Sequence, residues 1–130
     1  MPFGLCPSMS TSMQLDGLYQ DPYPYRANTP LTTTFTGKIN KDILQGSKIT
    51  ITASTSNIFG TLQVFRNIYD FCSLPGATCP YKATPDYSGA VTFTVPSQSS
   101  TDGQTVTFRV LLTNGDGSNV ACVFDSNYVL

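Results

Sequence analysis

The chain has 130 residues, a formal net charge of −1 and no histidine, and charged residues make up only 12% of it. That length suits a single domain, residues 1–130, with one hydrophobic core. The seven basic residues are scattered, so the sequence shows no footprint for nucleic acid.

The start of the chain, Met1 to Cys6, lacks the basic stretch followed by an apolar stretch that marks a signal peptide. No apolar run approaches the ~20 residues of a membrane-spanning helix. We therefore expect a mature secreted or lumenal chain (vacuolar or lysosomal) whose signal peptide is absent, with Met1 added.

Three strands are predicted in the first part of the chain. Met13–Tyr19 is the first, and the prolines of Asp21–Tyr25 end it because proline cannot donate to a strand ladder. Leu31–Thr36 is rich in β-branched and aromatic residues and is the second. Ser47–Thr55 alternates in polarity and is the third, with one face made of Ile49, Ile51 and Ala53.

Residues 58–71 are open to two interpretations. Apolar residues recur there at helical spacing, at Ile58, Leu62, Phe65 and Tyr69. Gly60, Val64 and the β-rich surroundings favour a strand instead, and this is the interpretation that we adopt.

The second half predicts three more strands. Ala90–Val95 and Thr105–Thr113 alternate, and each places three apolar side chains on one face: Val91, Phe93 and Val95 in the former, Val106, Phe108 and Val110 in the latter. Asn114–Gly117 is a hairpin signal, and Val120–Phe124 is the returning strand. About seven short strands without a convincing helix predict a β-sandwich.

Four cysteines allow three disulfide pairings. Cys72 and Cys79 bracket a short loop that holds Pro75 and Gly76, whereas Cys6 and Cys122 lie near the two ends of the chain. A zinc site is disfavoured because the chain has no Cys-x-x-Cys pair and no histidine. Buried free thiols are the other alternative to disulfides.

Catalysis has little support in the sequence. The chain has neither histidine nor glutamate, and its eight aspartates are dispersed, many of them beside turn residues where Asp serves the backbone. Asp116 alone is weak evidence for a bound cation. We therefore expect no enzyme, no metal and no cofactor.

Several features occur in the order and spacing of one family. They are Gly37–Ile43 leading to Gly46, Asp70-x-Cys72 with Cys79-Pro80, Val95-Pro96, the strand Val106–Thr113, and Ala121-Cys122. From about Cys6 to Leu130 the chain resembles the ML lipid-recognition domain. It is most similar to the secreted Niemann–Pick type C sterol carriers and the fungal phosphatidylglycerol/phosphatidylinositol transfer proteins.

The resemblance implies an immunoglobulin-like β-sandwich of two antiparallel sheets, with a lipid cavity between them. It also implies the disulfides Cys6–Cys122 and Cys72–Cys79. The sterol carriers usually have a third disulfide near the end of the first strand. That region, Tyr19–Pro24, holds no cysteine in this chain, which weakens any transfer of sterol specificity.

The resemblance further implies a set of lipid-binding side chains on the strands around the cavity. The set is Phe35, Ile49, Ile51, Val64, Phe65, Tyr81, Val91, Phe93, Val95, Val106, Phe108 and Val110. A solid core would use the same residue types, so the apolar stripes by themselves do not distinguish a cavity from a packed core.

The expected function is to bind a lipid, either a sterol or a phospholipid or a fatty acid, and to carry it between membranes with transient membrane contact. The expected mouth lies at the end with the cysteine loop, near Tyr81 and Pro96–Gln98. Tyr81 is the only titratable side chain among the candidates, so we expect lipid affinity to be nearly constant between mildly acidic and neutral pH. The alternative is a secreted interaction module with a solid core and no lipid ligand.

Overall fold

The computed structural model describes residues 3–23, 26, 28–94 and 105–129, and within them it contains eight strands and one short 3₁₀ helix, η1. The elements in chain order are β1 (Gly4–Leu5), β2 (Met13–Asp21), β3 (Pro30–Ile39), β4 (Lys48–Asn57), β5 (Gly60–Asp70), η1 (Phe71–Ser73), β6 (Thr84–Thr94), β7 (Thr105–Thr113) and β8 (Asn119–Val129). In the described part of the chain, no helix is long and apolar enough to cross a membrane.

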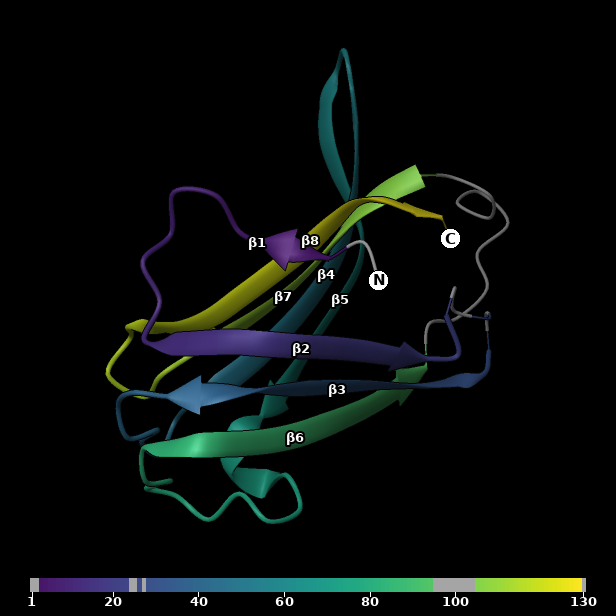
Figure 1. Ribbon diagram of the computed structural model, residues 1–130. Helices are drawn as coiled ribbons and strands as arrows, with labels where there is room; N and C mark the ends of the chain where they lie inside the picture. Colours follow the sequence, from purple (N-terminus) through teal and green to yellow (C-terminus); the bar gives the residue numbers. More distant parts are fainter. Residues whose placement is uncertain (1–2, 24–25, 27, 95–104, 130) are drawn as a thin grey trace.

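The strands form two antiparallel sheets that face each other (Figure 1). One sheet has the order β1-β8-β7-β4-β5 and the other has the order β2-β3-β6. Along one margin of the sandwich β2 lies close to β8. The opposite margin is formed by the edge strands β5 and β6, and we call it the β5–β6 margin. The predicted all-β, immunoglobulin-like sandwich is confirmed.

The ambiguous segment is a strand over most of its length. β5 covers Gly60–Asp70, so the strand interpretation is confirmed there and the helical one is wrong. The prediction is wrong at the ends, because Ile58 and Phe59 form a two-residue turn between β4 and β5 and Phe71 begins η1.

Several strands are longer than the sequence predicts, and the largest extensions are in β3, β6 and β8. β3 extends to Ile39, β6 begins at Thr84, and β8 continues well past Phe124. Pairing of Ile39 with Thr84 extends β6 through Pro85, which an edge strand tolerates because one of its sides makes no ladder. Tertiary pairing has therefore overridden local residue preference.

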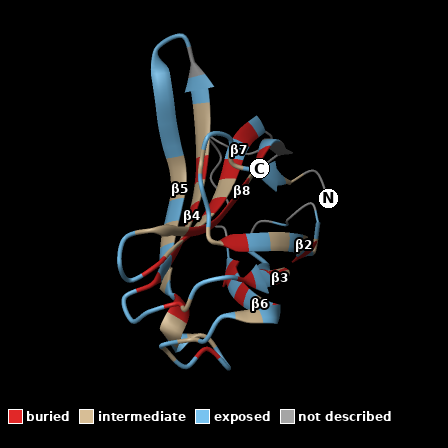
Figure 2. Cartoon of the chain, turned by 60° about the vertical axis from the view of Figure 1, so that its left-hand side comes forward, coloured by how far each residue is buried: buried red, intermediate tan, exposed pale blue. Residues whose placement is uncertain are grey.

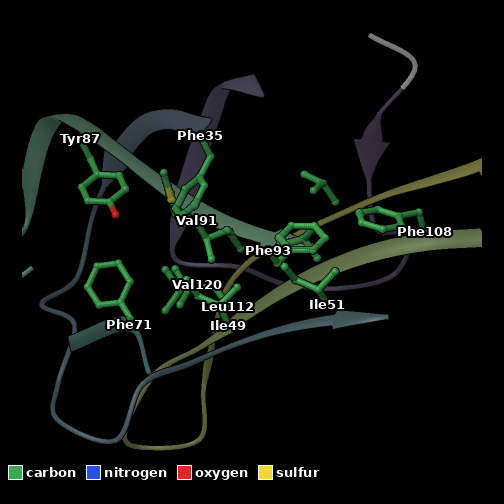
Figure 3. Packing of buried hydrophobic residues seen from close by; sticks show 14 of the residues in the cluster. Phe35, Ile49, Ile51, Phe71, Tyr87, Val91, Phe93, Phe108, Leu112 and Val120 are labelled. Carbon is green, nitrogen blue, oxygen red and sulfur yellow. The ribbon is translucent and has the colours of Figure 1, made fainter. Parts of the chain in front are cut away.

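Inward-facing side chains of both sheets form one buried cluster between the layers (Figures 2 and 3). The structure contains both disulfides implied by the resemblance. Cys6–Cys122 joins the segment after β1 to β8, and Cys72–Cys79 closes the loop after η1. The described cysteines include no free thiol.

Candidate functional site

Most of the predicted lipid-binding side chains lie between the two sheets. Eight are buried, namely Phe35, Ile49, Ile51, Val91, Phe93, Val106, Phe108 and Val110. Val64, Phe65 and Tyr81 are partly buried and pack against the cluster. Val95 falls outside the described residues.

Three of these aromatic rings make a stacked row across the sandwich, which we call the aromatic row. The ring centroids of Phe65 on β5 and Phe93 on β6 are 6.1 Å apart, and those of Phe93 and Phe108 on β7 are 6.3 Å apart. The ring planes are inclined by only 25° and 16°. The row therefore begins at the β5–β6 margin and crosses the gap between the sheets towards β8.

A β-bulge in β5 orients Phe65, the outer ring of the aromatic row, towards the core. Phe65 pairs with Ala53, but the next pair is Gln63 with Ser54, so Val64 is the extra residue of a β-bulge. A bulge changes the direction of side chains locally. Both Val64 and Phe65 consequently pack against the core instead of alternating between the core and solvent.

A second group of rings, which we call the loop-end cluster, closes the end of the sandwich that carries the cysteine loop. Its members are Phe35, Phe71, Tyr81 and Tyr87. Phe71 is fully buried and meets Tyr81 edge-on at 6.0 Å, and Tyr81 meets Tyr87 edge-on at 5.4 Å. Figure 3 shows Phe71 and Tyr87 at one end of the core and Phe93 and Phe108 at the other.

The structure thus separates Tyr81 from the aromatic row. Tyr81 precedes β6 and its backbone pairs with that of Ile43, with N···O distances of 2.7 and 2.9 Å. The predicted mouth loop, Pro96–Gln98, follows β6 and lies outside the described residues. Within the described residues, Tyr81 lies just before Thr84, where β6 begins, whereas Phe93 of the aromatic row lies next to Thr94, where β6 ends.

Polar contacts also hold the loop end together. Asn114 Oδ1 accepts a hydrogen bond from the backbone N–H of Leu44 at 2.8 Å, and Asn114 Nδ2 donates to the carbonyl of Asp42 at 2.9 Å. The Asp42 carboxylate in turn accepts from the backbone N–H of Ala83 at 2.8 Å. Burial raises the pKa of Tyr87 there, and the neighbouring Tyr81 raises it further.

Three hollows of the structure lie outside the aromatic row. One of about 190 Å³ lies between β1 and β2 and is bordered by Phe3, Leu15, Leu18 and Val123. The other two, of about 250 and 280 Å³, border Pro85 and Thr107 respectively. All three are smaller than the roughly 300–1,000 Å³ of ordinary ligand pockets. Among the described residues, the inner faces of the sheets pack on each other.

Sequence reasoning missed one charged residue of the inner face, Asp125. It is buried, and it pairs in register with Phe108. The predicted strand stopped at Phe124, one residue short of it. Extending the alternation of Ala121 and Val123 by one step would have placed Asp125 on the same face.

Comparison with known proteins identifies the family. A family model described as the ML domain matches residues 2–127, and the chain therefore belongs to the ML domain family, a family of lipid-binding domains. No curated protein matches the sequence.

Twelve chains of solved structures match the fold. Among them is a Niemann-Pick type C2 protein from Japanese carpenter ant, with a TM-score of 0.65 and 14% identity, covering 93% of this chain and 95% of that chain. At that identity the likeness concerns the fold alone.

Proposed function

We propose that the protein binds one lipid with its apolar body between the two sheets, along the aromatic row, and carries it between membranes. The ligand class is a sterol or a phospholipid. The observation that carries the proposal is the aromatic row, a continuous apolar path from the β5–β6 margin to the centre of the sandwich. Membership of the ML domain family supports a lipid as the ligand.

The proposed mechanism is physical. Phe65 and Phe93 belong to edge strands of opposite sheets, so rotation of these two rings opens the margin without breaking either ladder. A lipid tail then replaces contacts that the rings made with each other. Each buried CH₂ contributes about 0.8 kcal/mol, so a long chain compensates for separating the packed faces.

The β4–β5 hairpin is proposed as the element that contacts the membrane. It projects beyond the rest of the sandwich (Figures 1 and 2), and at its tip Ile58 is 93% exposed and Phe59 is 91% exposed. Two-residue hairpin turns normally select Asn, Asp or Gly, so turn geometry does not explain two large apolar residues. No charged residue occurs between Lys48 and Arg66. Such a tip suits insertion among lipid head groups.

The location is proposed as secreted or lumenal. Both disulfides suit an oxidising compartment. A carrier there meets membranes from the water side, which agrees with a projecting apolar tip.

Lipid occupancy tests the proposal. The purified protein is incubated with phosphatidylcholine vesicles that contain cholesterol, isolated by gel filtration, and extracted with organic solvent for mass spectrometry. We expect about one lipid per chain in the wild type. Phe108→Trp should lower occupancy, because the larger ring extends the packed row, at a stability cost of about 1–3 kcal/mol.

The matched control introduces the same ring on the other side of the same strand. Thr107 is exposed and neighbours Phe108 on β7, so Thr107→Trp should leave occupancy at the wild-type level. Wild-type protein that recovers no lipid would instead favour the solid interaction module. The close packing of the described inner side chains is the observation that keeps this second candidate in view.

A further inference from the structure

A guanidinium group lies beside one of the two disulfides. Arg109 on β7 donates a hydrogen bond from Nε to Cys122 Sγ on β8, at a distance of 3.3 Å. Cys122 is bonded to Cys6, in the segment after β1. Arg109 pairs in register with Phe124, and Leu111 pairs with Cys122, so these side chains share the outer face of the five-stranded sheet. The contact is therefore separate from the aromatic row between the sheets.

The charge of Arg109 is not offset by a neighbouring carboxylate. Within the described part of the chain, no carboxylate forms an ion pair with Arg109. Its cross-strand neighbours are Thr52 on β4 and Phe124 on β8, and neither carries a charge. The side chain is partly buried, which limits its screening by water. The positive charge therefore acts on the neighbouring sulfur.

The two sulfurs of this disulfide differ in access. Cys122 is only 2% exposed, whereas Cys6 is partly exposed. Cys6 and Arg109 both line the hollow of about 280 Å³ on the outer face, and the exposed residues Pro7 and Thr107 lie at its border. A small molecule that enters this hollow therefore meets Cys6 first.

The position of the charge matters for thiol–disulfide exchange. In that reaction a thiolate attacks one sulfur of the disulfide, and the other sulfur leaves as a thiolate. A leaving sulfur whose thiol has a lower pKa leaves faster, and a neighbouring arginine lowers such a pKa because it stabilises the negative charge. Arg109 contacts Cys122 Sγ, which is the leaving sulfur when Cys6 is attacked. Access and charge thus favour the same direction of exchange.

We propose that Cys6–Cys122 is an exchange site for small thiols, with Cys6 as the attacked sulfur and Cys122 as the leaving one. The incoming thiolate forms an S–S bond with Cys6 Sγ while the Cys6–Cys122 bond breaks, and the electron pair of that bond passes to Cys122 Sγ beside Arg109. A second thiolate then attacks the mixed disulfide, releases the small thiol as its own disulfide and leaves both cysteines reduced. The site lies on the outer face and does not depend on a lipid between the sheets.

Opening of this disulfide should loosen the start of the chain. β1 (Gly4–Leu5) pairs with β8 through those two residues. Phe3 precedes it and meets Phe108 edge-on, with the ring centroids 6.2 Å apart. Exchange at Cys6 should therefore weaken the contact of Phe3 with the inner ring of the aromatic row.

Reaction of the wild-type chain with 2-mercaptoethanol at pH 8 tests the direction of exchange. Samples are quenched with N-ethylmaleimide, and peptide mapping without reduction locates the adduct and the freed cysteine. We expect 2-mercaptoethanol on Cys6 and the maleimide on Cys122. The reverse placement, or equal placement on the two cysteines, would overturn the proposal and needs no variant.

Arg109→Gln should slow exchange at this disulfide about tenfold, because the leaving thiolate loses its charged donor. The disulfide of the cysteine loop, Cys72–Cys79, is an internal reference in the same samples and should keep its rate. A substitution that only loosened the packing would expose the disulfide and speed the exchange. An unchanged or raised rate in Arg109→Gln would therefore overturn the role of Arg109.

Arg66→Gln is the matched control. Arg66 and Arg109 both pair in register with Thr52, so the two substitutions remove the same charge from the same face of the sheet. The Arg66→Gln variant should exchange at the wild-type rate. Equal slowing in both variants would assign the effect to the charge of the whole face and would overturn the specific role of Arg109 at the leaving sulfur.

Discussion

The two ends of this sandwich are closed in different ways. At the loop end, edge-on rings around Phe71 are reinforced by the Cys72–Cys79 disulfide. The Asn114 side chain also ties the turn after β7 to the backbone of Asp42 and Leu44. Away from the loop end, the aromatic row closes the β5–β6 margin with stacked side chains. Phe65, at the outer end of this row, is only partly buried. Covalent and backbone ties fix the first end, whereas ring contacts that a ligand can replace close the second. The same core therefore combines a rigid base with a margin that can open.

Substituting phenylalanine by alanine in each of the two regions tests this difference in packing most directly. Phe71→Ala should lower the free energy of unfolding by about 3–5 kcal/mol, because the ring is fully buried and its neighbours are tied in place. Phe65→Ala should cost only roughly 1–2 kcal/mol, because its ring is partly exposed at an edge strand. Denaturant unfolding of the lipid-free variants gives both values.

Lipid uptake from vesicles should respond in the opposite order. Phe65→Ala should change the rate of uptake, whereas Phe71→Ala should change uptake only as far as it unfolds the chain. Equal stability losses at the two positions would mean that the two ends are equally closed, and the comparison would then fail.

The sequence predicted the fold well because its strong signals are local. Alternation in Thr105–Thr113 gave β7 with its observed bounds, and the hairpin signal at Asn114–Gly117 gave the turn after it. Alternation of apolar and polar residues does not predict a strand that forms mainly because it pairs with a neighbour. The first half of β6 is such a case, since it contains Pro85 and Gly89 and yet pairs with β3.

The candidate site was only partly predictable. Apolar stripes indicated which side chains face inward, and eight of them are buried. They did not show that Tyr81 and Phe65 belong to different groups of rings. The position of a side chain along the length of the sandwich depends on the register between strands that are distant in sequence. Asp125 was missed because aspartate is read as a turn residue unless the strand around it is already known. Asp125 is thus a further titratable side chain on the inner face, which the expectation of nearly pH-independent binding did not take into account.

The tip of the β4–β5 hairpin gives a second comparison, between this apolar tip and the rest of the surface. Ile58→Asp should weaken binding to phosphatidylcholine vesicles about tenfold, because one side chain of this size contributes roughly 1.5–3 kcal/mol on burial. Vesicle co-sedimentation measures the effect. Its dependence on salt should be weak, since the tip carries no charge.

Ile68→Asp is the matched control. Ile68 is also an exposed apolar residue of β5, 45% accessible, but it lies near the other end of that strand. The substitution adds the same charge and should leave vesicle binding near the wild-type level. Equal losses in the two variants would assign membrane contact to the β5 strand as a whole and remove the special role of the tip.

The smallest expected effect concerns a surface tie of the loop end. The hydrogen bond from Lys41 Nζ to Asp116 Oδ2, at 2.6 Å, together with donors from Ser118, holds the pKa of Asp116 well below its ordinary value. A lowered pKa in the folded state stabilises the fold at neutral pH, and the contribution is lost as the pH falls below about 4, where the unfolded chain takes up the proton first.

Asp116→Asn should therefore lower the melting temperature slightly at pH 7, and the difference from the wild type should shrink as the pH is reduced below 4. The effect is small because both side chains are solvated and such pairs contribute little. Lipid occupancy should not change, since the tie joins two segments at the end away from the aromatic row. A clear change in occupancy would show that the loop end also moves when lipid enters, and the rigid base would then belong to the opening mechanism.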